Sequence, residues 1–246
     1  MSRNYLNKQV LRENALVYDD YYQSGIIDGW EEHDKVYNFG HLFKIAKKAK
    51  MSLCNASVLD VGCGTGDIIP YLQKQGVKKY IGIDIYKPAL RIAKKKYPQE
   101  TFVLIDILDT TSSSSRTRRS RFTVPLKARL AFGGKSGMTT NKFDFVLSSG
   151  AISIKLKSLD NYEFLEAMVR KMWKMSRHGL AFNVLTDEDI APAKHLFYYS
   201  IEKVRKLCKQ IAPDAKIAIR RTPIHNRGYE DEAQIHVYMT KSSQLS

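Results

Sequence analysis

The sequence predicts an α/β protein in which helices cover both faces of a mostly parallel β-sheet. Short apolar segments alternate with longer amphipathic ones, at the spacing of parallel βαβ units. The composition, with 43% hydrophobic and 26% charged residues, is near the average for globular domains. A chain of 246 residues can bury a full core, so one domain is expected.

The individual elements follow from apolar periodicity. A helix is expected at about residues 32–50, where Val36, Phe39, Phe43, Ile45 and Ala46 form an apolar stripe. Five strands are expected at residues 58–61, 80–85, 101–105, 143–147 and 180–185. Helices are expected at residues 68–75, 88–96, 162–175 and 201–211. Two last strands, at 216–220 and 234–239, should form a hairpin.

One basic segment interrupts this alternation. Between Thr110 and Lys142 the chain has eight basic residues and no acidic one, which is over half of the net charge of +15. Four consecutive serines and an arginine-rich run have no apolar periodicity, so a flexible basic insertion is expected at residues 110–141. Clustered cations can bind phosphates, although low-complexity loops are more often only solvated.

Cysteine usage and hydropathy bear on location. No run approaches the ~18 apolar residues of a membrane-spanning helix, and the first residues lack the apolar core of a signal peptide. Cys54, Cys63 and Cys208 have no metal-ligand spacing. A cytoplasmic protein with reduced thiols and no metal site is therefore expected.

A glycine-rich loop is the most specific motif. The segment Val58-Leu-Asp-Val-Gly-Cys-Gly-Thr-Gly-Asp67 joins an expected strand directly to an expected helix. Glycines allow a tight turn and the close approach of a ligand to the backbone. Free N–H groups at a helix start favour an anionic group. The loop therefore predicts a ligand site.

An acidic residue supports the same site. Asp84 ends the second expected strand, 18 residues after Gly66. A carboxylate at the tip of the neighbouring strand can accept hydrogen bonds from both ribose hydroxyls. Together the loop and Asp84 indicate an adenosine-like ligand.

The spacing of the glycines distinguishes the possible cofactors. Dinucleotide enzymes use GxGxxG to hold a pyrophosphate, whereas this loop is GxGxG, is preceded by Asp60 and contains no basic side chain. It resembles motif I, E/DxGxGxG, of the class I S-adenosylmethionine-dependent methyltransferases. The resemblance covers residues 18–239 apart from the insertion. It implies a Rossmann-like α/β/α sandwich with a seven-stranded, mostly parallel sheet and an antiparallel last strand.

The resemblance also implies S-adenosylmethionine (SAM) as the cofactor and assigns residues to it. Asp84 would hold the ribose, with Ile85 against the adenine, and Asp106 would contact the adenine amino group beside Ile107. The segment that starts at Ser148 would line the methionine and the methyl group. The expected cofactor-binding set is Asp60, Gly62, Cys63, Gly64, Gly66, Asp84, Ile85, Asp106, Ile107 and Ser148.

The methyl acceptor is less well determined by the sequence. The Asn/Asp-Pro-Pro-Tyr tetrad of base-amine methylases is absent after the fourth expected strand, as is a catalytic cysteine of the C5-pyrimidine type. A small-molecule acceptor is expected. The alternatives are an RNA methyltransferase that uses the basic insertion and a noncatalytic SAM-binding module. A nicotinamide oxidoreductase is disfavoured by the glycine spacing.

The segments outside the sheet supply weaker candidates. Residues 1–50 are expected to form an N-terminal lid and helical segment, and residues 51–246 the methyltransferase domain. An aromatic group in the first segment could be a lid or ordinary packing: Tyr18, Tyr21, Tyr22 and Trp30. Possible bases follow the fifth strand, but each is more simply a surface residue, so no catalytic residue is assigned: Asp187, Glu188, His195 and His225.

Overall fold

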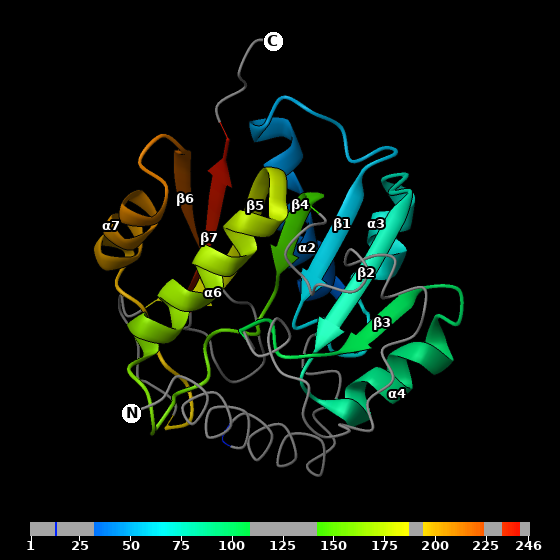
Figure 1. The fold of residues 1–246 in the computed structure, drawn as a ribbon, viewed down its shortest axis with the longest axis horizontal. Helices are drawn as coiled ribbons and strands as arrows, with labels where there is room; N and C mark the ends of the chain where they lie inside the picture. Colours follow the sequence, from blue (N-terminus) through cyan, green and yellow to red (C-terminus); the bar gives the residue numbers. More distant parts are fainter. Residues whose placement is uncertain (1–12, 14–31, 109–141, 187–193, 224–232, 242–246) are drawn as a thin grey trace, which may run out of the picture.

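A seven-stranded sheet forms the centre of the molecule (Figure 1). The computed structural model describes residues 13, 32–108, 142–186, 194–223 and 233–241. The strand order is β3-β2-β1-β4-β5-β7-β6. The strands are β1 (Ser57–Val61), β2 (Lys79–Asp84), β3 (Thr101–Leu104), β4 (Phe143–Ser148), β5 (Ser176–Leu185), β6 (Lys216–Pro223) and β7 (Ala233–Thr240).

The strand directions agree with the predicted architecture. β1 to β5 pair in parallel, and β7 lies between β5 and β6 and is antiparallel to both. The mostly parallel sheet with an antiparallel last strand is thereby confirmed. The order reverses at β1, since β2 and β4 flank it on opposite sides. Open α/β sheets bind ligands in the crevice outside the carboxyl ends of the strands at such a reversal, which here lies at β1 and β4.

Helices cover both faces of the sheet. Their bounds are α2 (Glu32–Lys48), α3 (Ile69–Lys74), α4 (Lys87–Lys96), α6 (Asn161–Met175) and α7 (Ile201–Ile211). One core cluster includes residues of α6 and α7, and a second includes residues of α2, α3 and α4. Figure 1 shows α6 and α7 in front of the strands and α2 behind them. The three-layer prediction is correct.

Local sequence explains where α6 begins. The Asp160 carboxylate accepts hydrogen bonds from the backbone N–H groups of Tyr162 (2.8 Å) and Glu163 (3.1 Å), which caps the first turn. Apolar residues then recur at helical spacing and are buried on the sheet: Phe164, Leu165, Met168, Val169 and Met172. The cap and this stripe together explain the close agreement with the predicted helix.

Two details differ from the predictions. Val36 is not part of the buried stripe of α2, because 52% of its surface is exposed, whereas Leu42 is fully buried. β5 begins at Ser176 rather than at residue 180, because Ser176 and Gly179 already pair with β4. Among the described helices, none combines the length and apolar character needed to cross a membrane.

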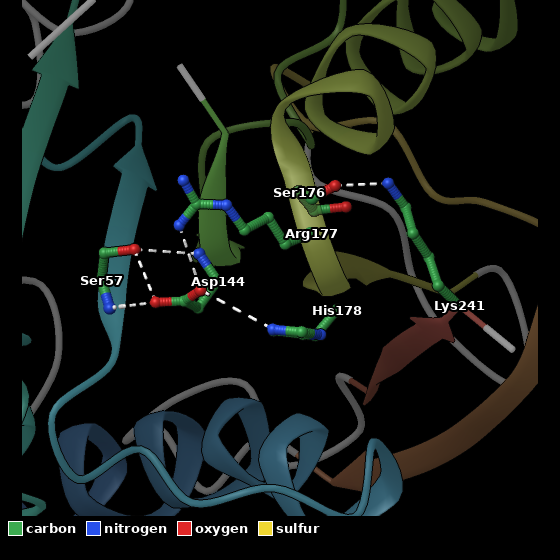
Figure 2. A network of polar contacts seen from close by, with 6 residues as sticks. All are labelled: Ser57, Asp144, Ser176, Arg177, His178 and Lys241. Atoms are coloured by element: carbon green, nitrogen blue, oxygen red, sulfur yellow. Dashed lines mark hydrogen bonds and ion pairs between the residues drawn. The ribbon is translucent and has the colours of Figure 1, made fainter. Parts of the chain in front are cut away.

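A polar network fixes the amino end of the sheet (Figure 2). The Asp144 carboxylate accepts hydrogen bonds from the backbone N–H (2.8 Å) and the hydroxyl (2.7 Å) of Ser57, and from Arg177 (3.3 Å). His178 lies 3.7 Å from the same carboxylate. Lys241 donates to the Ser176 carbonyl. The first residues of β1, β4 and β5 are thus tied together at the end opposite the crevice.

Replacement of Asp144 by alanine should destabilise the protein. Partial burial raises the pKa of Asp144, but hydrogen bonds from Ser57 and Arg177 outweigh it, so the net pKa is lowered. A carboxylate whose pKa is lowered on folding stabilises the protein above about pH 4, which is its pKa in the unfolded chain. This stabilisation is lost as the pH falls through the pKa of the folded state. We expect Asp144→Ala to cost about 1–3 kcal/mol at pH 7, with a smaller loss below pH 4, as measured by urea unfolding.

Candidate functional site

The glycine loop lies at the carboxyl ends of β1 and β2. The carbonyl of Ile83 accepts hydrogen bonds from the backbone N–H groups of Gly62 (2.8 Å) and Cys63 (3.1 Å). These bonds hold the loop against the end of β2. The loop residues therefore have fixed positions relative to both strand ends.

Two of the glycines are required for different reasons. Gly62 has φ +74°, and a Cβ there would lie 2.2 Å from the Cβ of Ala151. Gly64 has φ +52°, but a Cβ there would meet no atom of the described residues within 4 Å. Gly62 thus permits contact with the segment after β4, whereas Gly64 leaves open space beside the backbone. A ligand can approach the loop at Gly64.

The Asp84 carboxylate connects β2 to the loop. One oxygen accepts a hydrogen bond from the Gly64 N–H (2.8 Å) and the other from the Tyr86 N–H (2.7 Å). Its side chain is nearly buried, with 8% of the residue exposed. Burial raises the pKa of Asp84, while the bonds from Tyr86, Gly64 and Ile85 oppose that shift. A carboxylate has about four acceptor positions, so roughly one remains for a hydroxyl donor.

Asp60 lies beneath the loop rather than at its surface. Only 3% of the residue is exposed, and the Tyr80 hydroxyl donates a hydrogen bond to its carboxylate (2.8 Å). Burial raises the pKa of Asp60 to about 7, the bond from Tyr80 opposes that shift, and the charge of Asp84 adds to it. Its side chain therefore supports the loop from inside, and its ionised form is unfavourable there.

Two other predicted residues have side chains that point inward. Ser148 is fully buried, and its hydroxyl donates to the Val61 carbonyl (2.9 Å). Cys63 is 7% exposed, and a Cβ at Gly82 would lie 2.7 Å from its sulfur. These side chains join β4 to β1 and fill the space under the loop. Only their backbone atoms could face a ligand at the loop surface.

The end of β3 supplies the remaining predicted residues. Asp106 is half-buried and accepts a hydrogen bond from the Leu108 N–H (2.8 Å). The Ile105 N–H donates to the Asp84 carbonyl (3.0 Å), so this segment continues alongside β2. Ile85 is half-buried and Ile107 is 4% exposed. The structure thus brings a carboxylate and two apolar side chains to the edge that holds Asp84.

A buried chain of amides was missed by the sequence analysis. The Gly150 N–H donates to Asn183 Oδ1 (2.8 Å), and Asn183 Nδ2 donates to Gln234 Oε1 (2.6 Å). Gln234 Nε2 then donates to Asn38 Oδ1 of α2. Each of the three side chains is at most 3% exposed. The available signal was a polar residue inside each of two apolar strands, Ala-Phe-Asn-Val-Leu and Ala-Gln-Ile-His-Val.

Several weaker candidates cannot be related to this site. The aromatic candidates Tyr18, Tyr21, Tyr22 and Trp30, the acids Asp187 and Glu188, and His225 lie outside the described residues. So does the basic insertion at 110–141. His195 is described and is exposed. Within the described ranges, no group of three or more His, Cys, Asp or Glu residues could hold a metal ion.

Comparison with known proteins finds a similarity to methyltransferases. A family model described as a methyltransferase domain matches residues 58–118, which include β1, the glycine loop and Asp84. The match spans about a quarter of the chain, so this part of the chain is similar to a methyltransferase domain. No curated protein matches the sequence. A solved structure of the same fold contains bound SAM.

Solved structures share the fold at low sequence identity. Magnesium protoporphyrin IX methyltransferase from Synechocystis PCC 6803, with bound S-adenosylhomocysteine (SAH), is 16% identical, with a TM-score of 0.60 over 94% of this chain and 100% of its own. A SAM-dependent methyltransferase from Clostridium acetobutylicum is 10% identical, with a TM-score of 0.57 over 92% and 100%. The N-methyltransferase NodS from Bradyrhizobium japonicum, with SAH, is 14% identical, with a TM-score of 0.51 over 83% and 86%.

The residues of the crevice fit SAM. The donor contains a ribose, and one of its hydroxyls can donate to the remaining acceptor position of Asp84. Ile85, which is half-buried, provides apolar surface suited to an adenine ring, whereas Ile107 belongs to the core beside it. The open space beside Gly64 leaves room for the part of the ligand that lies against the backbone. The chemistry of this side-chain set and that of the family's donor therefore agree.

Proposed function

We propose that this methyltransferase transfers the methyl group of SAM to a small-molecule acceptor at the carboxyl ends of β1 and β4. The observation that carries the proposal is the bond between Asp84 and the Gly64 N–H, next to open space over the loop. It combines a ribose acceptor and an accessible backbone in one rigid unit.

The residue roles divide into contact and support. Asp84 accepts a hydrogen bond from the ribose, Ile85 packs on the adenine with Ile107 beside it in the core, and Asp106 accepts from the adenine amino group. The backbone at Gly62, Gly64 and Gly66 lies along the donor. Asp60, Cys63 and Ser148 support the loop through their buried side chains, as their burial and partners suggest.

Methyl transfer from SAM depends more on the alignment of the reactants than on acid–base groups. Bound SAM supplies a methyl group already activated by its sulfonium, so a nucleophile in line with the S–CH₃ bond displaces neutral SAH. The loop and the segment after β4 would hold this alignment, because Gly62 and Ala151 are in contact. Such placement contributes up to ~7–11 kcal/mol in the best intramolecular models.

A protein of the same fold supports a small acceptor. The Synechocystis neighbour is a methyltransferase of magnesium protoporphyrin IX, so the fold serves a small molecule there. We also propose that residues 51–246 form the catalytic domain, with residues 1–50 as a lid and helical segment and 110–141 as an insertion. The three free cysteines support a cytoplasmic location.

RNA as the acceptor is the second candidate, and a cation cluster favours it. Burial and the charges of Arg220 and Lys48 lower the pKa of Lys44. All three side chains are exposed, and none of them has an ion-pair partner within the described ranges. With the insertion, this cluster could contact phosphates.

Labelling of a lysate tests the acceptor class. The protein is incubated with methyl-labelled SAM and cell lysate, and the label is counted in small-molecule, RNA and protein fractions. We expect label in the small-molecule fraction, and none with Asp84→Ala, because that variant should not hold the donor.

Two other outcomes of this experiment would contradict a small-molecule acceptor. Label in RNA, together with an affinity that falls steeply with salt and a smaller salt slope after deletion of residues 112–121, would replace the proposal with the RNA alternative. SAH binding without any labelled fraction, in lysates from several growth conditions, would favour a noncatalytic SAM-binding module.

A further inference from the structure

The buried amides that join α2 to the segment after β4 have one possible hydrogen-bond direction. The Gly150 N–H can only donate, so the Asn183 atom that faces it must be the carbonyl oxygen. Asn183 Nδ2 must then donate to Gln234 Oε1, and Gln234 Nε2 to Asn38 Oδ1. A single backbone donor therefore orients three side chains from β5, β7 and α2.

Burial makes this arrangement costly to break. Asn38 is 3% exposed, and Asn183 and Gln234 are 2% exposed. An amide left unpaired in such surroundings loses its hydrogen bonds to water without replacement. The Gly150 N–H and the three side-chain amides must consequently stay paired together or separate together. Asn38 and Gln234 therefore behave as one unit, although they are 196 residues apart in sequence.

The Gly150 end of this hydrogen-bonded unit contacts the glycine loop. Gly150 has φ +69°, so its N–H bond to Asn183 helps to fix a left-handed backbone directly before Ala151. The Ala151 side chain packs where a Cβ of Gly62 would be. A shift of Gly150 is therefore passed to the loop that carries Gly64.

We propose that Asn38, Gln234 and Asn183 are positioning residues that couple the docking of α2 to the donor-binding loop. Docked α2 holds Gly150 and Ala151 against Gly62, and donor binding in turn stabilises the docked α2, because coupling between two sites is reciprocal. The proposal rests on the proposed donor site. It gives the N-terminal helix an influence on the reaction without contact with the reacting atoms.

Variants of Asn38, at the α2 end of the hydrogen-bonded unit, test the coupling. The hydrogen-bond direction makes Asn38 an acceptor, so Asn38→Asp keeps the required oxygen whereas Asn38→Leu removes it at similar size. Thr222→Val is the matched control, because it deletes a buried hydroxyl that bonds His236 and the Gln234 backbone carbonyl but leaves each side-chain amide bond of the unit in place. With selective ¹⁵N-glycine labelling, the exchange of the Gly150 amide is followed among 14 glycines.

We expect Asn38→Leu to speed exchange of the Gly150 amide about tenfold and to weaken SAH binding, measured by calorimetry, about 3- to 10-fold. Asn38→Asp should restore both values, and Thr222→Val should change neither. The coupling is overturned if Asn38→Leu and Thr222→Val give the same Gly150 exchange and SAH affinity.

The two proposals can fail separately. The Gly150 exchange is measured without ligand, so it reports on the amide unit even if SAH binds elsewhere. If Asp84→Ala retains wild-type SAH affinity, the donor site itself is wrong. If Asp84→Ala loses SAH but Asn38→Leu does not, only the coupling is wrong.

Discussion

Replacement of Asp84 by alanine should weaken SAM and SAH binding at least about a hundredfold, roughly 3 kcal/mol. The variant would lose the proposed acceptor of a ribose hydroxyl, and a hydrogen bond to a charged group contributes about 1.5–3 kcal/mol. It also frees the Gly64 and Tyr86 N–H groups, which relaxes the loop. Calorimetric titration with SAH measures the loss directly.

The control is a second carboxylate with a similar number of hydrogen bonds. Asp144→Ala removes three bonds at the amino end of the sheet, far from the crevice, so it should lower stability and leave SAH affinity unchanged. Asp84→Asn, which keeps one acceptor oxygen, should fall between wild type and Asp84→Ala. Equal SAH affinity in wild type and Asp84→Ala would refute the ribose assignment.

Replacement of Asp60 by asparagine should stabilise the protein above neutral pH. The folded pKa of Asp60 is raised to about 7 from 3.8, so the folded state binds more protons between those values. Stability is therefore lost as pH rises from about 4 to 7, by up to ~4 kcal/mol for a shift of this size. The asparagine side chain would stay neutral and could still accept the hydrogen bond from Tyr80.

Urea unfolding at pH 5 and pH 8 separates this effect from other consequences of the substitution. We expect Asp60→Asn to exceed wild type by about 4 kcal/mol at pH 8 and by only about 1–2 kcal/mol at pH 5. Asp144→Asn is a control with the opposite sign, because the pKa of Asp144 is lowered on folding. The Asp144→Asn variant should be less stable than wild type at pH 8. A stability difference for Asp60→Asn that does not change with pH would show that Asp60 does not titrate in this range.

Local patterns made the fold predictable. The predicted bounds of α7, residues 201–211, agree with the structure because its apolar stripe ends where the helix ends. Asp84 is predicted as a site residue because a strand that ends in an acid, next to a glycine loop, is typical of a ribose-binding site. These features depend on residues close together in sequence.

Features that depend on strand pairing were not predictable. Ser148 and Cys63 lie within the site motifs, but the direction of each side chain depends on the neighbouring strand, and both point inward. The amides of Asn38, Asn183 and Gln234 come from three elements that only the folded sheet brings together. A single sequence contains the polar residues but not their pairing.

The hydrogen bonds between Asp144 and Ser57 have a consequence for how the chain can change in length. Asp144 is the second residue of β4, and its bonds to Ser57 set the alignment of β4 beside β1 immediately after the 110–141 segment. Doubling the length of a flexible connection costs only about 0.6 kcal/mol. The chain can therefore gain or lose residues between β3 and β4 while the sheet stays in register. That connection is where a protein of this kind can acquire a new recognition segment without rebuilding the proposed methyl-donor site.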